Sequence, residues 1–222
     1  MKYTLTVSSE LRTACPDYVG LAVCATVVNS PFDAALWDEI HAFTDELLAT
    51  STLDEVKNQP AIAATRAAYK RCGKDPGRYR PSAEALRRRL LRGIPLYRID
   101  TLVDVINLVS LRTGFSIGGF DADKIEGNAL ELGIGRAGEA FEAIGRGVLN
   151  IDGLPVYRDA AGGIGTPTSD HERTKIDLQT QHLLIILNSY GGDAHLREAA
   201  AMTEALLQQC AAARQVETAW IR

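Results

Sequence analysis

This 222-residue sequence predicts an α+β fold, a mixed β-sheet packed with helices. Short alternating or β-branched apolar segments are typical of strands, and longer segments with apolar residues three or four apart are typical of helices. The two kinds do not alternate regularly, as they would in a parallel α/β sheet. Because 46% of the residues are apolar and no long linker or repeat interrupts them, we expect a single domain over residues 1–222.

The first part of the chain begins with an alternating strand at 3–8 and continues with a β-branched segment at 18–28, which is typical of a central strand. A helix is then expected, with Ser30 as its cap and Pro31 at the first helical position. Its apolar residues recur every three to four positions and predict one buried stripe: Phe32, Leu36, Ile40, Phe43 and Leu47.

Three further helices are predicted before the middle of the chain. The first follows Pro60 and ends near Gly73, and the second runs from Pro81 and Ser82 to Gly93, after the loop GKDPGRYRP. The third covers residues 100–113, is capped by Asp100, and is apolar on most of its sides.

The second half of the chain is expected to contain more strands than helices. Residues 160–170 are the most loop-like, and a long alanine-rich helix is expected from Asp193 to Ala213. The predicted strands lie at 115–120, 129–134, in short pieces within 145–158, at 183–187 and at 216–221.

Composition argues against several classes of protein. No apolar run reaches 18 residues and the N-terminal segment lacks a signal-peptide centre, so we expect a cytoplasmic protein without a membrane span. Four cysteines without a CxxC pair, and four histidines without HExxH or HxH spacing, predict reduced thiols, no metal and no cofactor.

A dense basic run extends from Arg66 to Arg92 in an otherwise acidic chain. It contains ten Lys/Arg and two acidic residues, a local charge of +8, whereas the whole chain carries −4. Clustered cations of this kind release counterions from a polyanion and predict a phosphate-binding strip. A solvated helix face is the simpler interpretation.

Two polar residues interrupt the apolar helix at 100–113. Asp104 and Asn107 lie three positions apart on one face, and buried polar groups need partners. They either bond to nearby backbone and fix a loop, or line a ligand pocket.

Several ordered motifs resemble one known family. RPSAEALRRRLLRGIPLYRIDTLVDVINLVSLRTGFSIGGFDADKIEG, then AGE, VYRD and PTSDHERTKIDLQTQ, resemble the B3/B4 domain, the editing module of the bacterial phenylalanyl-tRNA synthetase β subunit. The resemblance covers about residues 60–190. Without a catalytic synthetase core, the chain is similar to freestanding B3/B4 proteins, which implies hydrolysis of mischarged aminoacyl-tRNA in trans.

The resemblance also implies a substrate class. The synthetase-attached domain clears tyrosine from phenylalanine tRNA, whereas one freestanding group clears canavanine from arginine tRNA. The family's histidine before the Phe-Asp pair is replaced here by Gly118, whereas its glutamate corresponds to Glu172. This difference argues against tyrosine, implies a roomier pocket, and makes canavanyl-tRNA(Arg) a candidate substrate.

The site residues follow from the chemistry of ester hydrolysis, which needs a positioned water and a stabilised oxyanion. Backbone amides at Gly118 and Gly119, or in the loop at 162–165, are candidate oxyanion donors, and His171 is a candidate general base. Glu172 and Asp170 are expected to recognise a guanidinium-like side chain, with Asp104, Asn107 and Gly118 also lining the pocket. A solvated turn is the alternative for Glu172 and His171.

Binding of tRNA is expected through the basic run, with Tyr79 available for base stacking unless it pins the loop to the core. The expected tRNA-binding residues are Arg78, Tyr79, Arg80, Arg87, Arg88, Arg89 and Arg92. Three functions remain open: a trans-editing deacylase, a non-catalytic tRNA-binding module with the same fold, and a small-molecule binder or hydrolase that does not use tRNA.

Overall fold

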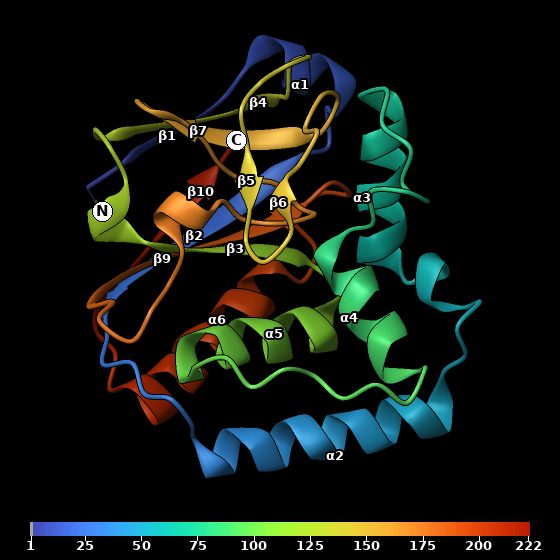
Figure 1. Ribbon diagram of the computed structural model, residues 1–222, viewed down its shortest axis with the longest axis vertical. Helices are drawn as coiled ribbons and strands as arrows, with labels where there is room; N and C mark the ends of the chain where they lie inside the picture. Colours follow the sequence, from blue (N-terminus) through green and yellow to red (C-terminus); the bar gives the residue numbers. More distant parts are fainter. Residues whose placement is uncertain (1) are drawn as a thin grey trace.

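The computed structural model describes residues 2–222 and confirms the α+β class, with two four-stranded sheets packed with helices (Figure 1). The α-helices, in chain order, are α1 Ser9–Ala14, α2 Ala34–Thr50, α3 Pro60–Arg71, α4 Ser82–Leu90, α5 Thr101–Thr113 and α6 Leu196–Ala211. The strands are β1 Thr4–Val7, β2 Val19–Thr26, β3 Ser116–Asp121, β4 Ala129–Ile134, β5 Glu142–Ala143, β6 Gly147–Val148, β7 Pro155–Asp159, β8 Gly162–Gly165, β9 His182–Ser189 and β10 Arg214–Ile221.

The larger sheet has the order β10-β2-β9-β3 and is antiparallel throughout. The second sheet has the order β1-β4-β7-β8, in which only β1 and β4 pair in parallel. β5 and β6 form a separate hairpin. In the larger sheet, β3 and β10 are therefore the two opposite edges.

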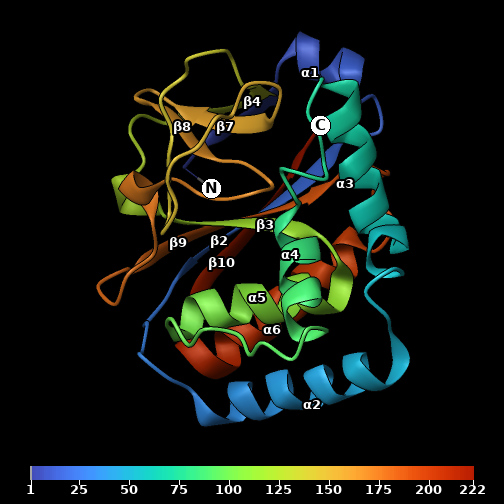
Figure 2. The same cartoon turned by 45° about the vertical axis from the view of Figure 1, so that its right-hand side comes forward.

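Two apolar cores lie on the two faces of the larger sheet. One face packs against α5 and α6, with α2 outside them, and the other face packs against the second sheet (Figures 1 and 2). Every residue of β3 is buried, as is most of β9, so these strands have apolar contacts on both faces. This explains why β9 is a continuous apolar run rather than an alternating one.

Several predicted elements are confirmed. β2 lies between β10 and β9, as expected of a central strand, and β4 has the predicted bounds. Asp100 caps α5, because its side chain accepts a hydrogen bond from the Val103 amide at 2.9 Å. Gly114 follows α5 with φ of 78°, a left-handed conformation that suits glycine and ends the helix.

The predicted start of the second helix was wrong. The N-cap of α2 is Asp33, whose carboxylate accepts from the Leu36 amide at 2.8 Å. Ser30 is held elsewhere, because its hydroxyl bonds to the Thr101 hydroxyl and its carbonyl accepts from the Thr101 amide. Phe32 consequently precedes the helix and is 45% exposed, rather than part of the buried stripe.

Two other predictions need correction. The loop expected at 160–170 contains β8, a strand whose glycines allow close packing under Phe120 and Phe141. The last helix begins at Leu196 rather than Asp193. Among residues 2–222, no helix has both the length and the apolar character needed to cross a membrane.

Candidate functional site

A cleft of about 460 Å³ opens between α5, the edge strand β3 and the segment that follows β8. We call it the α5 cleft. Its walls are contributed by Ser82, Leu86, Ile99, Val103, Ile106, Asn107, Ser110, Ile117, Gly119, Ile144, Arg146, Thr168, Ser169, Asp170, Lys175 and Ile176. An apolar cleft with a few polar groups is the usual form of a small-ligand site.

Asn107 is placed in the α5 cleft by helical spacing. Val103, Asn107 and Ser110 succeed one another at intervals of four and three on the same side of α5. Ser110 donates to the Phe115 carbonyl at 2.8 Å, whereas the Asn107 side chain makes no hydrogen bond to any residue within 2–222. Asn107 therefore offers a free amide to a ligand.

Asp170 is positioned by the tight turn that follows β8. The Thr166 hydroxyl accepts from the amides of Thr168 and Ser169 at 3.2 and 3.1 Å, and the Thr166 amide donates to the Ser169 carbonyl. Asp170 then returns to pair with Gly165 in an isolated bridge. The turn thereby directs the carboxylate toward β3.

The environment of Asp170 favours a protonated carboxyl group. Burial raises its pKa to about 7, and the Gly119 amide, which donates to Oδ2 at 3.1 Å, opposes this only in part. The residue as a whole is still partly exposed, since it lines the cleft. A carboxyl group with this pKa can accept and release a proton near neutral pH.

The glycine pair in β3 does not have the expected roles. A Cβ on Gly118 would lie 2.7 Å from Cζ of Phe120, and the cavity left beside them is only about 10 Å³. The expectation of a roomier pocket at Gly118 was wrong, because the Phe120 ring fills the space. The Gly119 amide is already bound to Asp170, so it is not a free oxyanion donor.

Asp104 lies outside the α5 cleft. Its carboxylate accepts a hydrogen bond from the indole Nε1 of Trp37 at 2.7 Å, and the residue is 1% exposed. Burial raises its pKa to about 6, a shift that the Trp37 hydrogen bond opposes. Asp104 thus connects α5 to α2 and bonds to the Ile99 backbone, as in the first of the two alternatives, whereas only Asn107 lines the cleft.

Glu172 and His171 also lie outside the cleft lining. Glu172 pairs with Lys175 at 2.6 Å, and its pKa is lowered first by that hydrogen bond and then by the Gly145 amide. His171 Nδ1 accepts from the Arg173 amide at 2.9 Å, and its ring lies edge-on against Phe141. Burial and the nearby Arg173 lower the His171 pKa, which favours the neutral imidazole.

Sequence reasoning missed part of the cleft rim. Arg146 is exposed at the cleft in the β5–β6 hairpin, between Gly145 and Gly147, which both have positive φ. Within the described chain, its guanidinium has no hydrogen-bonding partner. An arginine between two glycines is a sequence signal for an exposed turn, so it could have been identified.

The basic run is not a continuous phosphate-binding strip, because several of its cations have structural partners. Arg66 pairs with the buried Glu84 at 2.7 Å, and Lys74 is 7% exposed and donates to the carbonyls of Asn150 and Asp152. The predicted strip at these positions was wrong.

The three consecutive arginines of α4 mostly bind backbone carbonyls. Arg87 donates from Nε to the Leu111 carbonyl at 3.0 Å, at the C-terminal end of α5, and burial lowers its pKa. Arg88 donates to the Leu53 carbonyl at 2.9 Å. Arg89 donates to the Pro95 carbonyl at 2.7 Å and stacks on Tyr97. Arg87 and Arg88 thus hold neighbouring segments together.

The other predicted tRNA contacts differ in availability. Tyr79 is partly buried, with the Lys74 ammonium 3.8 Å from its ring centroid, so it pins the loop as in the alternative interpretation. Arg78, Arg80 and Arg92 are exposed. Neither the Arg80 nor the Arg92 guanidinium has a hydrogen-bonding partner among residues 2–222.

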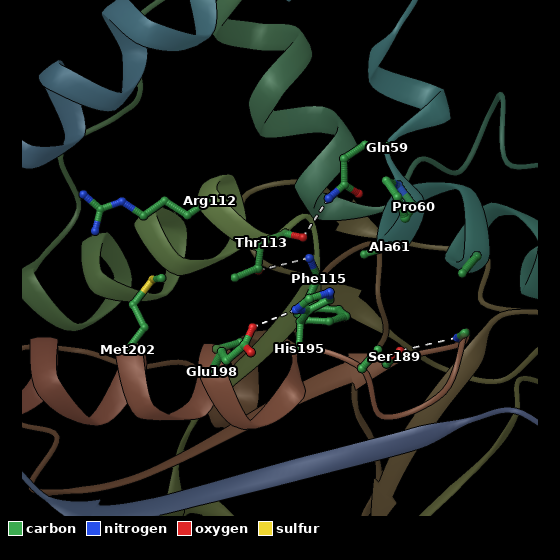
Figure 3. A pocket seen from close by; sticks show the side chains of 14 residues that line it. Gln59, Pro60, Ala61, Arg112, Thr113, Phe115, Ser189, His195, Glu198 and Met202 are labelled. Carbon is green, nitrogen blue, oxygen red and sulfur yellow. Dashed lines mark hydrogen bonds and ion pairs between the residues drawn. The ribbon is translucent and has the colours of Figure 1, made fainter.

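A second pocket, of about 380 Å³, lies where the N-terminal ends of α3 and α6 approach the end of α5 (Figure 3). We call it the α6 pocket. Figure 3 shows its polar groups bonded to one another: Gln59 donates to the Thr113 carbonyl at 2.8 Å, and His195 bonds to Glu198 at 2.7 Å. Arg112, also in its lining, pairs with Glu39 at 3.0 Å.

No metal centre is evident in the part of the chain described, since no three His, Cys, Asp or Glu side chains converge there. Its four cysteines are free thiols.

Comparison with known proteins identifies the family. Residues 64–207, well over half of the chain, match the family described as the B3/4 domain. The phenylalanine–tRNA ligase beta subunit of Bartonella henselae is 36% identical over 97 residues, which cover 43% of this chain but 12% of that protein. The chain therefore corresponds to a small part of that relative's length.

A solved structure supports the same fold. An N-terminal fragment of the phenylalanyl-tRNA synthetase beta-subunit from Pyrococcus horikoshii superposes with a TM-score of 0.50 and 14% sequence identity, covering 97% of this chain and 50% of that one. At this identity the likeness concerns the fold alone. The family match over residues 64–207 is sufficient on its own, and the chain belongs to the B3/4 domain family.

Proposed function

We propose that this protein is a deacylase that hydrolyses mischarged aminoacyl-tRNA, and that the α5 cleft receives the aminoacyl group. The relatives by sequence and fold are tRNA synthetase beta subunits, which supports tRNA as the partner. The observation that carries the proposal is Asp170, a carboxyl group with a pKa of about 7 on the wall of an otherwise largely apolar cleft.

Asp170 has the properties of a general base for ester hydrolysis. Its ionised form accepts a proton from water, which attacks the ester carbonyl; the C–O bond to the ribose then breaks as the protonated Asp170 returns that proton to the leaving ribose oxygen. The free Asn107 amide can donate to the carbonyl oxygen as negative charge develops there. The vicinal ribose hydroxyl of the tRNA can assist the water.

The remaining walls favour a substrate side chain with an apolar stem. Val103, Ile106 and Ile176 contribute apolar surface, and Asp170 is the only carboxylate in the lining. Asp170 is assigned to the attacking water, so the lining offers no second carboxylate for a cationic head group, and Arg146 and Lys175 add positive charge there. Canavanine remains a candidate to be tested, but it is not singled out by the lining of the cleft.

A panel of mischarged tRNAs tests the proposal. Canavanyl-, tyrosyl- and other non-cognate esters are incubated with and without protein, and release of the amino acid is measured. At least one ester should decay faster with protein. If none does while uncharged tRNA still binds, the protein is a binding module; if only a free amino-acid ester is cleaved, tRNA is not its substrate.

A further inference from the structure

An unusual surface lies in the segment that connects α4 to α5. Two of its large side chains are strongly exposed: Tyr97 is 67% and Ile99 55% accessible, and Phe32 beside the segment is 45% accessible. Single exposed apolar residues are common, but a group of them beside a cleft indicates a binding surface. We call Phe32, Arg89, Arg92, Tyr97 and Arg98 the aromatic–arginine surface.

Guanidinium groups lie over the aromatic rings of this surface. Arg89 Cζ is 4.0 Å from the centroid of Tyr97, and Arg98 Cζ is 5.0 Å from that of Phe32 and 4.9 Å from that of Trp37. At these distances the cation is attracted to the ring face, and both groups are held in place.

These cations, Arg89, Arg92 and Arg98, form no ion pair with any residue of the described chain, although Arg98 is near enough to the Asp104 carboxylate to oppose the rise in pKa that burial causes there. Other arginines of the protein do form ion pairs: Arg158 pairs with Glu139 and Arg173 with Asp159. The aromatic–arginine surface therefore carries positive charge that the Asp104 carboxylate offsets only in part, at Arg98, and it suits an anionic partner.

The surface leads directly to the α5 cleft. The connecting segment runs between α2 and α5 (Figure 1), and Ile99, the residue after Arg98, is part of the cleft lining. A ligand lying along this segment would reach the cleft at Ile99.

We propose that the aromatic–arginine surface binds the unpaired 3′ end of an RNA chain and guides its last nucleotide into the α5 cleft. A base stacks on Tyr97, and phosphates bind Arg89, Arg92 and Arg98, because exposed aromatic rings interleaved with arginines are the usual platform for single-stranded nucleic acid. An acidic peptide would satisfy the arginines but would leave the Tyr97 ring without a stacking partner. This inference rests on the proposed function.

Binding of uncharged tRNA tests the inference. Fluorescence anisotropy compares intact tRNA with the same tRNA trimmed of its unpaired 3′ nucleotides. Wild-type protein should bind intact tRNA more tightly. Tyr97→Ala should weaken that binding by about 5-fold or more, the effect of losing one stacked base, whereas Tyr97→Phe, which keeps the ring, should retain it.

Charge is tested separately with Arg98→Gln. This variant should bind intact tRNA more weakly, and the slope of log affinity against log salt should fall by about one. Arg197→Ala is the matched control, because Arg197 lies 5.0 Å from the Trp220 ring on β10, at the opposite edge of the sheet from β3. The Arg197→Ala variant should bind intact tRNA with wild-type affinity.

Equal affinity of wild type, Tyr97→Ala and Arg98→Gln for intact tRNA would overturn the inference. So would equal affinity of the wild type for intact and trimmed tRNA. Since the tRNA in this assay carries no amino acid, these outcomes do not depend on hydrolysis. The deacylation panel and the binding assay can therefore fail independently of each other.

Discussion

The α5 cleft and the α6 pocket have comparable volumes, about 460 and 380 Å³, but their polar groups are in different states. In the α6 pocket, the side chains of Gln59, Arg112 and His195 are bound to other protein groups. In the α5 cleft, the side chains of Asn107 and Arg146 have no partner within the described chain, and the Asp170 carboxyl group has a raised pKa. We therefore base the proposed site on the unsatisfied polar groups of the α5 cleft rather than on cavity volume.

Asp170→Asn is expected to have the largest effect. Asparagine has the same shape and can still accept from the Gly119 amide, but it cannot take a proton from water. Deacylation should slow by about 10²–10⁴-fold. In the wild type, the rate should fall as the pH is lowered through about 7, because protonated Asp170 is not a base.

The matched control for Asp170→Asn is Glu198→Gln in the α6 pocket, which should leave both the rate and its pH dependence unchanged. An Asp170→Asn enzyme with wild-type turnover would remove Asp170 from the mechanism.

Filling the two cavities should have unequal effects. Val103→Phe places a ring in the α5 cleft. It should lower kcat/KM by about tenfold or more, because the ring occupies volume that the aminoacyl group needs. Ala194→Phe adds bulk to the α6 pocket and should not alter kcat/KM. Steady-state kinetics on one ester measures kcat/KM for both variants. A larger loss in Ala194→Phe than in Val103→Phe would indicate that the substrate binds in the α6 pocket instead.

Gln59→Ala should affect stability rather than activity. The Gln59 side chain accepts from the Ile62 amide at 2.9 Å as the N-cap of α3 and donates to the Thr113 carbonyl. Loss of such a cap lowers the free energy of unfolding by about 0.5–2 kcal/mol. Urea denaturation measures the loss, and a wild-type kcat in the folded variant confirms that the α6 pocket is structural.

The last prediction concerns the dependence of stability on pH. The Asp170 pKa is raised in the folded state, so the protonated group stabilises the fold fully below its ordinary pKa of 3.8, and this stability is lost as the pH rises to about 7. Asp170→Asn should therefore increase the free energy of unfolding at pH 8 relative to wild type, and less so at pH 4. A variant less stable than wild type at pH 8 would contradict the proposed burial of the carboxylate.

The sequence predicted the regular elements better than the site. Apolar periodicity and local caps such as Asp100 identified α3, α5 and β4, because these signals depend on residues close in the chain. The start of α2 could not be predicted in this way, since Ser30 is bound to Thr101, 71 positions away.

The site residues were harder to predict because their partners are also distant in the chain. Asp170 was named only beside Glu172, because the sequence does not show which of two neighbouring carboxylates turns toward β3. The basic run was overvalued, since the partners of Arg66 and Arg87 are a carboxylate 18 positions away and carbonyls 24 and 25 positions away. Charge composition does not show which cations are already neutralised or hydrogen-bonded.

Binding in the α5 cleft is tested most directly by an NMR titration with a non-hydrolysable aminoacyl-adenosine, in which an amide replaces the ester. The Gly119 backbone amide and the Asn107 side-chain amide should shift on binding, while the amides of Gly191 and Ala194 in the α6 pocket should not. Shifts at Gly191 and Ala194 without shifts at Gly119 and Asn107 would contradict binding in the α5 cleft.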